Sequence, residues 1–169
     1  MVESPSQSGA ISFGPTIDRL LRLFKVDFVA DPAQPSWVRL FVATVVSLAG
    51  SLGADAILVA LGTRVFPSTK GFVHFRFSDY SKLTVIGVVI ACAAWPIVTR
   101  ISSQPRWLFF RMAIVVTLVL FVPDLWIFIH GSPGKAVSVL LLMHLAIALV
   151  TYNALVHIAP GGGRRTSRP

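Results

Sequence analysis

The sequence predicts an all-α fold, an integral membrane four-helix bundle preceded by a short amphipathic interfacial helix. Of its 169 residues only 13% are charged and 54% are hydrophobic, whereas about a quarter of the residues in a soluble domain are charged. Four apolar runs of about 20 residues follow one another, and this is the length that crosses a hydrocarbon core. We expect one domain over 37–158, with transmembrane helices at 37–61, 80–99, 107–129 and 136–158.

The two ends of the chain differ in composition from this apolar domain. Residues 1–16 are rich in Ser, Gly and Pro, which predicts a disordered tail. In 17–28, apolar residues recur at helical spacing opposite a basic face, which predicts an amphipathic helix lying on anionic lipid headgroups. The alternative is a helix that caps the bundle or a partner subunit. Residues 159–169 contain GGGRR and predict a flexible basic tail that contacts headgroups.

The loop 62–82 is the largest predicted external segment. Val73, Phe75 and Phe77 alternate with polar residues, a period of two that is typical of a strand. Such a segment either folds over the mouth of the bundle or rests on the outer leaflet, and both alternatives stay open.

The basic residues predict the orientation of the bundle. A net charge of +8 in a soluble protein would suggest nucleic acid, but here the basic residues bracket apolar runs, so we expect no nucleic-acid partner. Ten of the fifteen Lys and Arg residues lie on the side of the termini, which predicts cytoplasmic termini. Aromatic residues near the ends of the runs fit interfacial belts; they are Trp37, Tyr80, Trp95, Trp107 and Tyr152.

Three ionisable Asp and His residues lie well inside the apolar runs, away from their ends, and each is a candidate functional residue because charge is costly inside a membrane. Asp55 lies in the first run, Asp124 in the third and His144 in the fourth. At 1.5 Å per residue they lie about 9, 8 and 12 Å below the outer boundary. Inward-facing helix faces would therefore bring these three side chains together at one level.

Small and polar residues share the faces of this candidate cluster. In the first run Ser47 and Ser51 precede Asp55 at intervals of four, which favours close helix packing. Thr117 shares a face with Asp124, and Tyr152 shares one with His144. Pro123 removes a backbone donor beside Asp124, as polar pockets within helices often require.

Three interpretations of the cluster compete. In the first, His144 hydrogen-bonds Asp55 or Asp124 and only fixes which helix faces meet. In the second, the carboxylates and the imidazole relay protons or bind a small cation or polar ligand. In the third, these residues lie at the outer interface and are wetted by the loop. We expect no metal and no cofactor, because the metalloprotease spacing of two His residues is missing.

Short motifs in the apolar runs resemble a family of small, uncharacterised four-helix bacterial membrane proteins that carry a domain of unknown function. These motifs are Ala-Asp-Ala at 54–56, VPDL at 122–125 and LLMHLAIALV at 141–150. The resemblance covers about 37–158 and implies a four-span fold in a bacterial inner membrane. It implies no known activity and no catalytic residues.

The function predicted from the sequence is association rather than catalysis. The small size, the close-packing first run and the absence of catalytic motifs favour a non-enzymatic accessory subunit or homo-oligomer, whose partners are the lipid bilayer and itself or another membrane subunit. The alternative is a small proton-coupled transporter or ion-conducting bundle that uses Asp55, Asp124 and His144.

Overall fold

The ends of the helices follow from local sequence signals. Ser36 caps the first long helix, because its hydroxyl accepts a hydrogen bond from the backbone N–H of Arg39 at 3.4 Å. Pro105 opens the third long helix at a position where its missing N–H costs nothing. Gly131, with φ of 96°, makes the left-handed turn between the last two helices.

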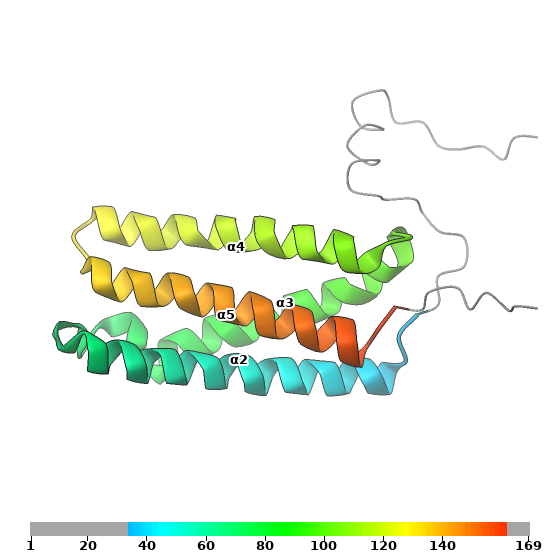
Figure 1. The fold of residues 1–169 in the computed structure, drawn as a ribbon, viewed down its shortest axis with the longest axis horizontal. Helices are drawn as coiled ribbons and strands as arrows, with labels where there is room; N and C mark the ends of the chain where they lie inside the picture. The colour runs from blue at the N-terminus through cyan, green and yellow to red at the C-terminus, as the bar shows by residue number, and fades with distance from the viewer. Residues whose placement is uncertain (1–33, 162–169) are drawn as a thin grey trace, which may run out of the picture.

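A computed structural model describes residues 34–161 as an antiparallel bundle of helices (Figure 1). Its long helices are α2 (Trp37–Val65), α3 (Phe77–Ile101), α4 (Pro105–Ile129) and α5 (Gly134–Ile158). All four are long and apolar enough to cross a membrane. The predicted all-α four-helix fold is therefore confirmed, and the chain is a multi-pass membrane protein.

The helices are longer than the predicted spans at most of their ends. α2 continues four residues past 61, and α3 starts three residues before 80 and ends two residues after 99. α4 and α5 each start two residues early and end where expected. The predicted interfacial helix 17–28, the tail 1–16 and most of the tail 159–169 lie outside the described residues.

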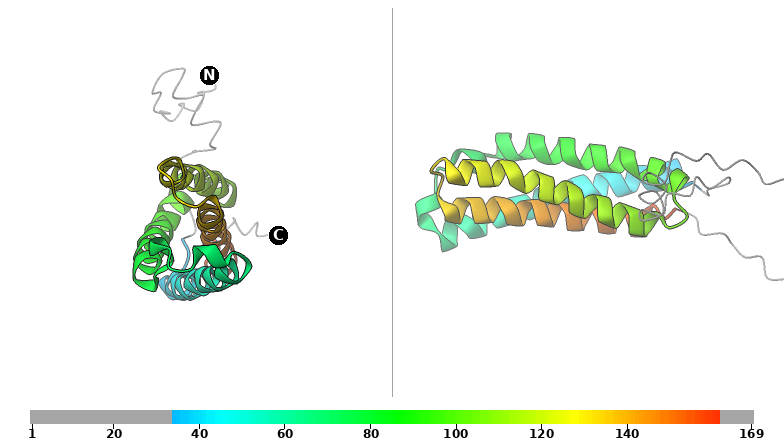
Figure 2. Two further views of the ribbon diagram at one scale, coloured as in Figure 1. Left: turned by 90° about the vertical axis from the view of Figure 1, so that its left-hand side faces the viewer. Right: turned by 90° about the horizontal axis from the view of Figure 1, so that it is seen from above.

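α2 and α5 form the central antiparallel pair of the bundle, with the most extensive interface. A Cβ atom on Gly50 would lie 2.8 Å from Val150, and one on Gly62 would lie 2.7 Å from Val139. These two glycines therefore let the helix backbones approach closely at the middle of α2 and near its C-terminal end. α4 packs on the side of α5 away from α2, and α3 packs chiefly on α2 (Figure 2).

Buried side chains form two apolar clusters, one near each end of the bundle. The first cluster, at the end that carries both termini, includes Ala43, Trp95, Phe109 and Leu155. The second, at the opposite end, contains Phe75, Tyr80, Ala136, Val139, Leu140 and Met143. The candidate ionisable residues lie between these two clusters.

The loop between α2 and α3 folds against the end of the bundle, while Val73 stays exposed. It contains two single turns of 3₁₀ helix, η1 (Pro67–Thr69) and η2 (Val73–Phe75). Thr69 and Phe75 are buried. The strand-like prediction for 73–78 is wrong, because α3 already begins at Phe77 and the described residues offer no strand to pair with.

Candidate functional site

Asp55 is completely buried on the inward face of α2. Its neighbours on that face, Ala43, Ser47 and Ser51, are also fully buried, so the predicted small, polar stripe faces the interior. Asp55 Oδ2 accepts a hydrogen bond of 2.6 Å from the Thr84 hydroxyl of α3. Its second oxygen, Oδ1, has no hydrogen-bond partner within the protein.

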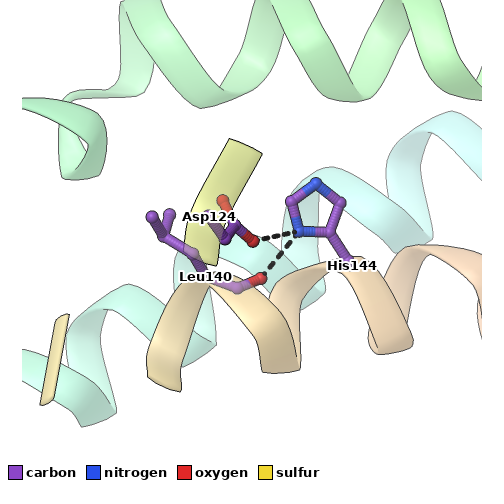
Figure 3. Close-up of polar contacts among 3 residues, drawn as sticks. All are labelled: Asp124, Leu140 and His144. Atoms are coloured by element: carbon purple, nitrogen blue, oxygen red, sulfur yellow. Dashed lines mark hydrogen bonds and ion pairs between the residues drawn. The ribbon is translucent and has the colours of Figure 1, made fainter. Parts of the chain in front are cut away.

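Asp124 and His144 form a contact between α4 and α5 (Figure 3). The distance from His144 Nδ1 to Asp124 Oδ2 is 3.1 Å. The same Nδ1 lies 3.0 Å from the Leu140 carbonyl oxygen. A carbonyl oxygen only accepts, so Nδ1 must carry the hydrogen.

The single hydrogen on Nδ1 cannot serve both oxygens well. Asp124 Oδ2 lies within ion-pair distance of the ring, yet it has no aligned donor. The Leu140 carbonyl therefore takes the hydrogen bond, and Asp124 contributes mainly the attraction of its charge. The second ring nitrogen, Nε2, points away from Asp124 in Figure 3, which leaves it available for another partner.

Asp55 lies at the level of this pair but forms a separate part of the site. The contacts of Gly50 and Gly62 with α5 fix the register of the two helices, and they place Asp55 level with the turn that holds His144. Among residues 34–161, however, no three His, Cys, Asp or Glu side chains converge as metal ligands do. The predicted cluster is thus an Asp124–His144 pair with Asp55 nearby.

Of the predicted supporting residues outside α2, Thr117 lies on the face of the site and Tyr152 lies away from it. Thr117 is buried on the same face of α4 as Asp124. Tyr152 is not part of the site, because it stacks on Phe109 and donates a hydrogen bond to the Arg106 carbonyl at 3.4 Å. It lies two turns beyond His144, so a shared helix face did not bring it to the same level.

Sequence reasoning missed two polar residues and misplaced one aromatic residue. Thr84 binds Asp55, and its spacing of four from Tyr80 and from Val88 was the available signal. Thr151 is buried, with a hydroxyl that has no partner within the protein. Trp95 is not an interfacial residue: it is completely buried, and its Nε1–H donates to the Ala159 carbonyl at 2.7 Å.

The four long apolar helices define a multi-pass membrane protein, and a candidate site of two Asp residues and one His residue lies on three of them between two apolar clusters. Comparison with protein-family models, curated proteins and solved structures finds no match to this chain. The family resemblance of its short motifs stays a prediction.

Proposed function

We propose that this chain takes up and releases protons at Asp55, Asp124 and His144 within the membrane. The observation that carries the proposal is the burial of two carboxyl groups, beside a half-buried imidazole, between apolar clusters. One oxygen of each carboxyl group has no hydrogen-bond partner within the protein. Such groups are costly in a membrane, and proton binding is chemistry that all three share.

A proton fits this site better than a larger solute or a metal ion. A solute needs a pocket and a cation needs several ligands around one point. A proton needs only a series of proton-binding groups that are connected by hydrogen bonds or by water. Asp55, hydrogen-bonded to Thr84, and the Asp124–His144 pair are groups of this kind.

Proton flux into liposomes tests the proposal. The full chain is reconstituted into phosphatidylethanolamine and phosphatidylglycerol vesicles, and a potassium diffusion potential drives protons inward past an enclosed pH dye. Asp55→Asn, Asp124→Asn and His144→Gln should each reduce the flux to that of protein-free vesicles, because each removes a proton-binding group.

Matched variants control for general effects of these substitutions. His157→Gln is the closest control for His144→Gln, because the exposed His157 also places Nδ1 near a carbonyl one turn earlier, at 2.9 Å. Asp79→Asn, in the first turn of α3, controls for loss of a carboxyl group. Wild-type flux in all three site variants would overturn the proposal.

Association stays the second candidate function, as a homo-oligomer or an accessory subunit. Its support is α4, which is the most apolar span and the one with the least of its surface buried within the described chain. An apolar helix surface is as stable against lipid as against a partner protein, so this surface does not by itself indicate association. The geometry of the ionisable groups therefore favours the proton function.

We also propose that both termini lie in the cytoplasm of a bacterial cell, with the chain in its inner membrane. The excess of Lys and Arg on the side of the termini supports this orientation. A fluorescent protein fused after Pro169 should fluoresce, and alkaline phosphatase fused there should be inactive. Phosphatase inserted after Lys70, in the loop at the opposite end, should be active. An active phosphatase at the C-terminus would contradict the orientation.

A further inference from the structure

Three buried hydroxyl groups in the bundle have no hydrogen-bond partner within the protein. They belong to Ser47 and Ser51 of α2 and to Thr151 of α5, and each residue is at least nine-tenths buried. A hydroxyl in a helix usually bonds to the carbonyl one turn earlier. In this chain Thr44, Thr63 and Ser138 do so, at 2.9 Å. The three buried hydroxyls are therefore oriented differently from their neighbours.

These hydroxyls lie along a line that begins at Asp55. Ser51 and Ser47 precede Asp55 in the sequence at intervals of four residues, and each interval corresponds to about 6 Å along the helix axis. The contact of Gly50 with Val150 places Thr151 between the levels of Ser47 and Ser51. Thr151 is also two turns from His144 on the same face of α5, so the line approaches both parts of the site.

Spacings of this size suit water. Two oxygens about 6 Å apart are too far apart for a direct hydrogen bond and are bridged by one or two water molecules in series. Buried waters in proteins typically bind polar groups that would otherwise be unsatisfied. Asp55 Oδ1 and the three hydroxyls are such groups.

We propose that water enters transiently between the packed helices along Asp55 Oδ1, Ser51, Thr151 and Ser47, and that it conducts protons between the ionisable site and the end of the bundle carrying both termini. The proposal rests on the proton function above and adds its route. Hydroxyl groups suit this task because each one both donates and accepts a hydrogen bond.

An aromatic cluster closes the route one turn beyond Ser47. Cys92 lies beside the hydroxyls of Thr44 and Ser47, and Trp95 follows it by one turn on α3. The Trp95 ring makes an edge contact with Phe109, which stacks on Tyr152. Protons that reach Ser47 must therefore pass this aromatic cluster. Movement of its rings would control proton access from the end of the bundle that carries the termini.

The route is tested in the same vesicle assay with variants that remove only hydroxyl groups. Thr151→Val and Ser51→Ala should each lower proton flux roughly five- to thirtyfold, because a chain that loses one hydrogen-bonding member loses about that factor. Thr151→Ser keeps the hydroxyl and should retain most of the flux. Thr63→Val and Ser138→Ala, whose hydroxyls bond to their own helix, should behave like the wild type.

The outcomes separate the route from the site. Loss of flux in Asp55→Asn and His144→Gln, with wild-type flux in Thr151→Val and Ser51→Ala, would overturn the route and leave the proton site standing. Wild-type flux in the site variants would overturn the proposed function and the route with it. Loss of flux in Thr63→Val equal to that in Thr151→Val would also overturn the route.

Discussion

Trp95→Ala should lower the free energy of unfolding by about 3 kcal/mol or more. Trp95 is completely buried, so its removal leaves a large cavity at the end of the bundle that carries the termini. The change also leaves the Ala159 carbonyl without the indole N–H that binds it at 2.7 Å. Lipid offers no compensation, because the ring contacts protein on all sides. Equilibrium unfolding in mixed micelles measures the change.

Two further variants separate the contributions of Trp95. Trp95→Phe keeps an aromatic ring against Phe109 but loses the hydrogen bond, so a loss of about 1 kcal/mol is expected. Trp37→Ala is the matched control, because Trp37 is 79% exposed and its removal should change the free energy of unfolding little. A Trp95→Ala protein as stable as Trp37→Ala would show that Trp95 does not hold the helices together.

Gly62→Leu should destabilise the bundle by about 2 kcal/mol, within the range for overpacked sites. Even a Cβ atom at Gly62 would lie 2.7 Å from Val139 Cγ2 and 3.2 Å from its Cγ1. Because valine is stiff about χ1, the side chain cannot simply turn away, and α2 must move away from α5. The same unfolding measurement detects the loss.

A pair of alanine variants tests the cause. Gly62→Ala should be destabilised to a smaller extent, and adding Val139→Ala should recover part of that loss, because it removes the two methyl groups in the way. Gly53→Ala is the control on the same helix, since a Cβ atom there meets nothing within 4 Å. If Val139→Ala gives no recovery, the close contact does not account for the effect of Gly62.

The fold was predictable because the membrane restricts it so strongly. Runs of about 20 apolar residues with few charges have few options besides spanning helices. The exact ends were less predictable, because helices extend past the apolar runs into the interface. α3 begins at Phe77 and includes Asp79 in its first turn, where a carboxylate interacts favourably with the helix dipole. Hydropathy does not detect such a turn.

The candidate site was predictable in its composition and less so in its contacts. Periodicity identifies a face, so the inward stripe of α2 that leads to Asp55 was predicted correctly. The register between helices depends on packing at Gly50 and Gly62, which periodicity does not reveal. The bond from Thr84 to Asp55 depends in the same way on how α3 packs on α2, and it was missed. Tyr152 was predicted to share a face with His144, but it lies two turns away and contacts Phe109.

The pairing of α2 with α5 has a consequence for biogenesis. α2 is the first of the four spans to leave the ribosome and α5 is the last. Until α5 is inserted, the stripe that leads to Asp55 lacks the helix with which it shares its largest interface. Among residues 34–161, the hydrogen bond that the Asp55 carboxyl group accepts at that stage comes from Thr84 of α3. The chain therefore places the Asp55 carboxyl group in the membrane early and completes its surroundings only when the fourth span is inserted.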